Sequence, residues 1–196
     1  APTNEKKIQA AKEKLKEWIR KYHITLFSVG NGTASRESEQ VIVELFHEIP
    51  EKVQYVIVNE AGASVYSASK LATEEFPKFD VGQRSATSIA RRLQDPLAEL
   101  VKIDPQSIGV GQYQHDLPTA RLKDRLDFVV SKAVNRVGVN VNTASQELLK
   151  NISGLSQATA KSIVEYRREH GELKNRKELK KIPKIGAKSY EQAAGF

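Results

Sequence analysis

Residues 145–169 read SQELLKNISGLSQATAKSIVEYRRE. Apolar residues recur at helical spacing on both sides of Gly154, a residue type that commonly interrupts helices. The pattern predicts a helix, a turn and a second helix, over residues 145–152, 153–156 and 157–169. A related stretch, NRKELKKIPKIGAKSYEQAA, follows at 175–194, with the corresponding segments at 175–182, 183–186 and 187–194. The chain therefore ends in two copies of one helix–turn–helix unit, which predicts an all-α C-terminal part.

Both turns resemble the hairpin of the helix-hairpin-helix family, which has the form hydrophobic-x-Gly-hydrophobic-Gly. The first hairpin keeps the first glycine as Gly154 and has Ser156 in place of the second. The second hairpin has Lys184 in place of the first glycine and keeps Gly186. Two such motifs normally pack as a pseudo-symmetric pair, so the resemblance implies a tandem helix-hairpin-helix domain.

A hairpin that opens a helix is suited to bind phosphate. Its first N–H groups have no partner within the helix, and a glycine lets a phosphate approach closely. We expect backbone N–H donors from Leu155, Ser156, Gln157, Ile185, Gly186 and Ala187. Side chains beside the turns are expected to contribute positive charge, from Lys161, Lys184 and Lys188, and hydroxyl donors, from Thr159 and Ser189. Gly154, which would allow the close approach, is the remaining residue of the predicted site. Such contacts hold a nucleic-acid backbone without reading bases. The alternative is a compact helical bundle whose hairpins only pack on protein.

The charge distribution points to a polyanion as the partner of the C-terminal part. Residues 119–196 contain 16 of the 31 Lys and Arg and 8 of the 24 Asp and Glu, a net charge of +8. The preceding 118 residues contain 15 Lys and Arg and 16 Asp and Glu, a net charge of −1. RNA or DNA is the partner that this asymmetry favours, although a lysine-rich solvated surface has the same composition.

The N-terminal part alternates between helix and strand signals. Apolar residues at helical spacing predict helices over 8–22, 35–46 and 63–76, and β-prone runs predict strands over 24–29 and 55–58. This order is typical of a parallel α/β sheet with helical crossovers. Trp18 lies on the apolar face of the first helix and is expected in the core. Two strands make a poor sheet, so we expect partner strands in sequence that precedes Ala1.

The rest of the chain is predicted to be helical. The expected helices span 85–93, 96–103 and 122–137, and residues 104–118 have no periodicity. We therefore expect three parts: an α/β domain over 1–80, a helical connector over 81–118 and the hairpin domain over 119–196.

Several longer motifs resemble the Tex family of bacterial transcription accessory proteins. They are GNGTASRE at 30–37, EAGASVYSAS at 60–69, SIARRLQDP at 88–96, IGVGQYQHD at 108–116 and VNVNTAS at 139–145. The resemblance implies a truncated RNase H-like domain of the YqgF type, α/β in class, followed by the all-α tandem helix-hairpin-helix domain. It also implies a cytoplasmic, nucleic-acid-binding transcription factor that could contact RNA polymerase. The family's first YqgF strand and its S1 RNA-binding domain have no counterpart in this sequence.

An RNase H-like fold also raises the hypothesis of a metal-dependent nuclease. That chemistry needs clustered carboxylates, and here Glu37 and Glu60 follow the two predicted strands. Both are equally explained as turn or helix-start residues. The four histidines are dispersed, there is no cysteine, and no apolar run is long enough for a membrane span. The sequence thus predicts a non-catalytic nucleic-acid-binding segment without metal, cofactor or membrane contact. A protein-interaction scaffold is the second hypothesis and a nuclease the third.

Overall fold

The computed structural model describes residues 4–109 and 113–196. It divides into two compact units, Ala1–Gln94 and Asp95–Phe196, and each is described here by itself. This division lies inside the segment 81–118 that was expected as a connector, and the three-part organisation stays a prediction. Of the motif at 108–116, residues 110–112 lie outside the described part of the chain.

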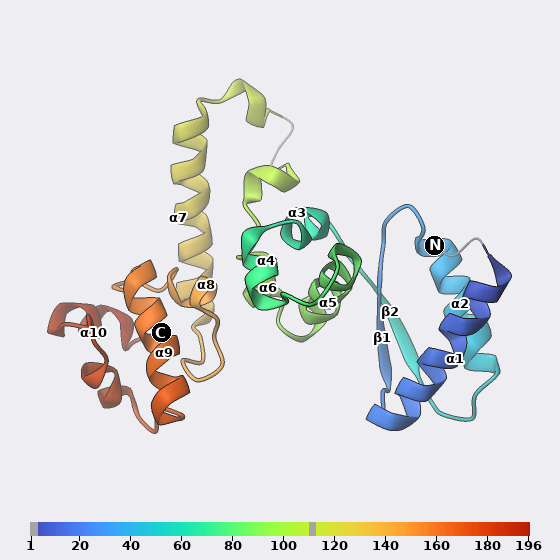
Figure 1. Cartoon of the computed structure of the whole chain (residues 1–196). Helices are drawn as coiled ribbons and strands as arrows, with labels where there is room; N and C mark the ends of the chain where they lie inside the picture. Colours follow the sequence, from blue (N-terminus) through green and yellow to red (C-terminus); the bar gives the residue numbers. More distant parts are fainter. Residues whose placement is uncertain (1–3, 110–112) are drawn as a thin grey trace. The chain divides into compact units, whose positions relative to one another are not determined.

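The first unit is the predicted α/β arrangement. Its elements are α1 (Glu5–Tyr22), β1 (Leu26–Gly30), α2 (Ser35–His47), β2 (Gln54–Val58), α3 (Ala63–Ser67), α4 (Lys70–Glu75) and α5 (Val81–Gln94). The two strands pair in parallel, from Leu26 opposite Gln54 to Gly30 opposite Val58. Figure 1 shows α1 and α2 beside one face of the strands, with α3 and α5 on the other side. The predicted class, α/β followed by all-α, is confirmed.

Helices cover both faces of this small sheet, as parallel strands require. On one face, Ile19 of α1 and Leu45 of α2 are buried together, and the rings of Phe27 and Phe46 meet edge to face at 5.8 Å. On the other face, the Ser28 hydroxyl group donates a hydrogen bond of 3.1 Å to the carbonyl oxygen of Ile89 in α5. The segment 81–94 therefore belongs to the α/β unit.

Two expectations for this unit are wrong. Trp18 was expected in the core but is 42% exposed, with the Lys14 ammonium 5.6 Å from its ring centre. The helix expected over 63–76 is two helices, because Ser69 interrupts it. The Ser69 hydroxyl oxygen accepts from the N–H of Ala72 at 3.1 Å and so caps a new helix, α4.

A cluster of ion pairs joins α1 to α2. The ammonium group of Lys12, buried between the helices, lies 2.7 Å from a Glu44 oxygen and 2.9 Å from a Glu48 oxygen. Lys16 donates to the other oxygen of Glu48 at 2.9 Å. Hydrogen bonds from Lys16 and Lys12 lower the pKa of Glu48, since neighbouring cations favour the charged carboxylate.

This cluster predicts that acid destabilises the first unit. Because the folded pKa of Glu48 lies below its unfolded value, the stabilisation is present above that unfolded value, about 4.3, and is lost as pH falls through the folded pKa. Urea unfolding followed by fluorescence of Trp18, the single tryptophan, measures this loss. Glu48→Gln is expected to flatten the pH dependence. An unchanged pH dependence in that variant would show that the ion pairs do not act as described.

The second unit is all helical. Its elements are α6 (Pro96–Leu100), η1 (Pro105–Ile108), η2 (Gln114–Asp116), α7 (Thr119–Val137), α8 (Gln146–Leu149), α9 (Gln157–His170), η3 (Arg176–Lys181) and α10 (Ala187–Ala193), where η denotes a 3-10 helix. The segment 175–182 was expected to be a helix, and residues 176–181 form the 3-10 helix η3. This helix ends at Lys181 because Pro183 favours an extended conformation for Ile182, observed at ψ 130°. In the described residues, no helix is long and apolar enough to cross a membrane.

One apolar core holds the second unit together. It contains Val134 of α7, residues of α8 and α9, and the apolar residues of both hairpins; its most buried members are Val134, Leu149, Ile152, Ala160, Ile163 and Ile182. The end of the chain returns to the start of the hairpin region, where the N–H of Val139 donates to the carbonyl oxygen of Phe196 at 3.0 Å. The two hairpins are thus parts of one folded body.

Candidate nucleic-acid interface

The two hairpins have the same turn geometry despite their different sequences. In the first, the N–H of Leu155 donates to the carbonyl oxygen of Ile152 at 3.0 Å, and Gly154 has φ 81°. In the second, the N–H of Ile185 donates to Ile182 at 3.2 Å, and Lys184 has φ 70°. Each turn therefore bends through a left-handed residue at its third position, as in type II turns.

Lys184 is an unusual occupant of this position. A left-handed conformation costs a residue with a Cβ about 1–2 kcal/mol, and glycine avoids that cost. The first hairpin uses glycine here, whereas the second keeps a lysine whose side chain is exposed. Strain of this kind is often retained where a side chain has a role.

The two hairpin glycines have different roles. A Cβ on Gly154 would lie 2.7 Å from the Cβ of Gln192 and 2.9 Å from the carbonyl oxygen of Ser189, both in α10. Gly154 thus lets the first hairpin pack directly on the second. A Cβ on Gly186 would meet no described atom within 4 Å, and its φ of −83° suits any residue. Gly186, rather than Gly154, leaves the approach to its turn open.

Several predicted N–H donors are already bonded within the chain. The N–H groups of Leu155 and Ile185 close the turns. The N–H of Ser156 donates to the Thr159 hydroxyl group at 2.6 Å, while the N–H of Thr159 donates back to the Ser156 hydroxyl group at 3.3 Å. This capping box occupies two of the N–H groups at the start of α9, which are then not available to a ligand. Of the predicted donors in the first hairpin, Gln157 is the one that no described group accepts.

The second hairpin is more open. Gly186 begins α10, and no side chain in the described part of the chain caps that helix. Both Gly186 and Ala187 are exposed, and their N–H groups have no acceptor within residues 4–109 and 113–196. The predicted backbone donors that remain accessible therefore lie mainly at the second turn.

The predicted side chains separate into exposed and internal groups. Lys161, Lys184 and Lys188 are exposed, and Lys161 lies 3.6 Å from Glu165. The other two lysines form no ion pair with any residue that the structure describes. Thr159 is only 6% exposed and its hydroxyl group belongs to the capping box, so it acts in the structure as a capping residue. Ser189 is half-buried beside Gly154.

Asn135 of α7 positions the first hairpin and was not found from sequence. Its side-chain N–H donates to the carbonyl oxygen of Asn151 at 2.8 Å, and its side-chain oxygen accepts from the N–H of Ser153 at 2.8 Å. One amide thus satisfies a donor and an acceptor of the turn. The residue is separated from its partners by 16 and 18 positions, and no local pattern marks it.

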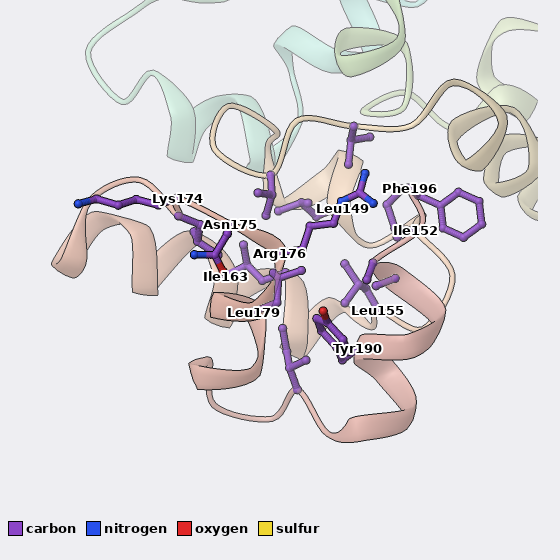
Figure 2. Close-up of a pocket in the computed structure, with 16 residues that line it drawn as sticks. Leu149, Ile152, Leu155, Ile163, Lys174, Asn175, Arg176, Leu179, Tyr190 and Phe196 are labelled. Atoms are coloured by element: carbon purple, nitrogen blue, oxygen red, sulfur yellow. The ribbon is translucent and has the colours of Figure 1, made fainter.

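The inner sides of the hairpins line an apolar cavity of about 230 Å³. Figure 2 shows Ile152 and Leu155 of the first hairpin around it, with Tyr190 of α10, while Lys174 points away from it. The apolar residues of the motif therefore face the core. The exposed lysines of the hairpins, Lys161, Lys184 and Lys188, are not among the residues that line this cavity.

The two carboxylates considered for metal binding have local roles. Glu37 is exposed in the first turn of α2. The carboxylate of Glu60 lies against the glycine turn, where a Cβ on Gly30 would come within 2.1 Å of a Glu60 oxygen. Within residues 4–109 and 113–196, no three His, Asp or Glu side chains are grouped so that they could hold a metal ion.

The fold and the hairpins define the class: a YqgF-like α/β unit followed by a helix-hairpin-helix unit. Residues 1–94 match the family described as the Tex protein YqgF-like domain, and residues 134–196 match the helix-hairpin-helix motif. A protein called YdcI from Bacillus subtilis is 60% identical over the whole chain, which covers 27% of that protein. The transcriptional accessory protein Tex of Neisseria gonorrhoeae is 57% identical over 93% of the chain and 24% of its own length.

A human protein named S1 RNA-binding domain-containing protein 1 is 49% identical over 94% of the chain and 19% of its own length. The chain belongs to the Tex family. It spans about a quarter of the length of the bacterial relatives it matches.

The different roles of the two glycines are testable by the same substitution. Gly154→Ser introduces a side chain at positive φ against α10, and is expected to destabilise the second unit by about 1–3 kcal/mol. Gly186→Ser provides a good helix cap in open space, and is expected to leave the free energy of unfolding unchanged or to raise it by at most about 0.5 kcal/mol. Amide hydrogen exchange of peptides from residues 145–196 measures both. Equal effects of the two substitutions would contradict the assignment.

Proposed function

We propose that this chain is a non-catalytic, nucleic-acid-binding segment that holds the phosphate backbone of RNA or DNA at its hairpins. The Tex-family relatives and the helix-hairpin-helix match support nucleic-acid binding as the general role. The finer proposal concerns where the backbone binds. It assigns the contact to Gln157 and Lys161 of the first hairpin and to residues 184–188 of the second.

The observation that carries this proposal is the open second turn. Gly186 leaves space for an acceptor, and the N–H groups of Gly186 and Ala187, both exposed residues, have no acceptor among the described residues. Lys184 and Lys188 are exposed beside them. The segment 174–188 contains seven Lys and Arg and one Glu. An anion at this turn would meet both hydrogen-bond donors and positive charge, which is the chemistry that a phosphate requires.

Gly186→Asp tests the proposed contact without disturbing the fold. Asp is a good helix cap, so the variant should stay folded, but its carboxylate would occupy the place of a phosphate. We expect binding of labelled duplex DNA, measured by fluorescence anisotropy, to weaken by at least about tenfold, the equivalent of one lost charge-assisted contact. Gly195→Asp is the matched control, since Gly195 is exposed and equally unobstructed. Equal losses in both variants would show a general charge effect and contradict a contact at Gly186.

Lys184→Gly separates stability from binding. Replacing a left-handed lysine by glycine removes backbone strain, so the second unit is expected to become more stable by up to about 1 kcal/mol. Loss of the charge should at the same time reduce the slope of log affinity against log salt for duplex DNA by about 0.9. Thermal unfolding monitored by circular dichroism and a salt series of anisotropy titrations measure the two effects. A variant that is stabilised but binds with an unchanged salt slope would remove Lys184 from the proposed interface.

The scaffold and nuclease hypotheses predict different results. If the unit only holds other domains of a transcription factor or contacts RNA polymerase, the folded chain should show no salt-sensitive binding to nucleic acid. A nuclease would require magnesium-dependent cleavage that is lost in Glu37→Gln or Glu60→Gln. The packing of Glu60 against the Gly30 turn favours a structural role for that carboxylate.

A further inference from the structure

Helix α7 carries a row of exposed cations that the hairpins do not explain. Figure 1 shows α7 as the long helix that precedes α8. Its exposed cations, apart from Lys123, are Arg121, Arg125, Lys132 and Arg136. At 3.6 residues per turn these four positions fall within about 60° of arc, so they share one face over a length of about 22 Å. We call this row, together with Phe128, the α7 stripe.

Phe128 lies in the middle of the cations. Its position is about 60° from Arg125 and about 40° from Lys132 around the helix axis, and successive members of the stripe are separated by about 4.5–6 Å along the axis. The ring is 59% exposed, although an aromatic side chain of this size usually contributes to a core. A large apolar ring in the interval between two pairs of cations is therefore the feature that needs an explanation.

The cations of the stripe have no ion-pair partner in the part of the chain that the structure describes. The remaining cation of the helix, Lys123, lies on the opposite side and pairs with Asp127 at 3.1 Å. An ordinary solvated helix commonly balances its charges in this way. The stripe instead presents an excess of positive charge, four cations with Asp124 as the acidic residue at its edge, and this excess is complementary to a polyanion.

We propose that the α7 stripe binds single-stranded nucleic acid, with its cations on successive phosphates and Phe128 stacked on a base. Cations that follow a backbone together with an aromatic platform are the combination that single-strand binding requires. A paired duplex does not fit this face as well, because its bases are stacked inside and cannot reach Phe128. This inference rests on the proposed role in nucleic-acid binding, but it does not use the hairpins.

The first test separates stacking from charge in the whole chain. Phe128→Ala is expected to weaken binding of a labelled oligodeoxythymidylate strand by at least about fivefold, the lower end of aromatic base stacking. It should leave the affinity for an abasic strand of equal length unchanged, because that strand keeps the phosphates and lacks the bases. Val137→Ala is the matched control, since Val137 is 74% exposed on another face of the same helix. Equal effects on the two strands, or no effect on either, would overturn the stacking role.

The second test addresses the cations. Arg125→Gln together with Lys132→Gln should reduce the slope of log affinity against log salt for the single strand by about 1.4, at about 0.7 for each cation. Lys123→Gln removes a charge from the opposite face and is expected to leave the slope unchanged. A slope that is insensitive to the stripe variants would overturn the proposal.

These variants also distinguish the stripe from the hairpins. Loss of single-strand binding in the stripe variants with duplex binding retained would support the stripe whatever Gly186→Asp shows. Unaltered single-strand binding in the stripe variants, with duplex binding lost in Gly186→Asp, would reject the stripe and leave the hairpin proposal intact. Circular dichroism confirms that each variant is folded.

Discussion

The contact between Gly154 and helix α10 is the constraint on which the hairpin unit depends. A side chain at Gly154 would collide with Gln192 and with the backbone of Ser189. Its absence brings the two hairpins together and buries their apolar residues in one core. The left-handed conformation of Gly154 also sets the direction of the turn into α9. One glycine thus determines both the local turn and the packing of the pair.

The two hairpins have the same turn but different surroundings, and this difference suggests a division of roles. The first hairpin is fixed by Asn135, closed by the Ser156 capping box and packed on α10. The second has an uncapped helix start, an unobstructed Gly186 and exposed lysines. In this account the first hairpin mainly orients the unit, and the second supplies most of the phosphate contact. The departures from the family pattern, Ser156 and Lys184, are the residues that separate the two roles.

The sequence was sufficient for the order of elements but not for the roles of individual residues. Apolar spacing located α1, α2 and both strands, because their apolar side chains pack on one another, with Phe46 of α2 in contact with Phe27 of β1 and Tyr55 of β2. The pattern did not reveal the interruption at Ser69, where a hydroxyl group satisfies a helix N–H, and it placed the exposed Trp18 in the core. At the hairpins, sequence identified the turns and their lysines. It could not show that Thr159 is used in a cap or that Asn135 reaches the first turn, since both depend on distances across the fold.

The most direct test of the central claim is an amide chemical-shift titration of the isotope-labelled chain with a short DNA duplex. The largest changes are expected at the N–H groups of Gln157, Gly186 and Ala187, which have no acceptor among the described residues. Smaller changes are expected at Leu155 and Ile185, whose N–H groups already bond within the turns. Changes confined to residues outside 154–161 and 184–189, or none at a concentration that gives binding by anisotropy, would contradict the assignment of the hairpins as the phosphate site.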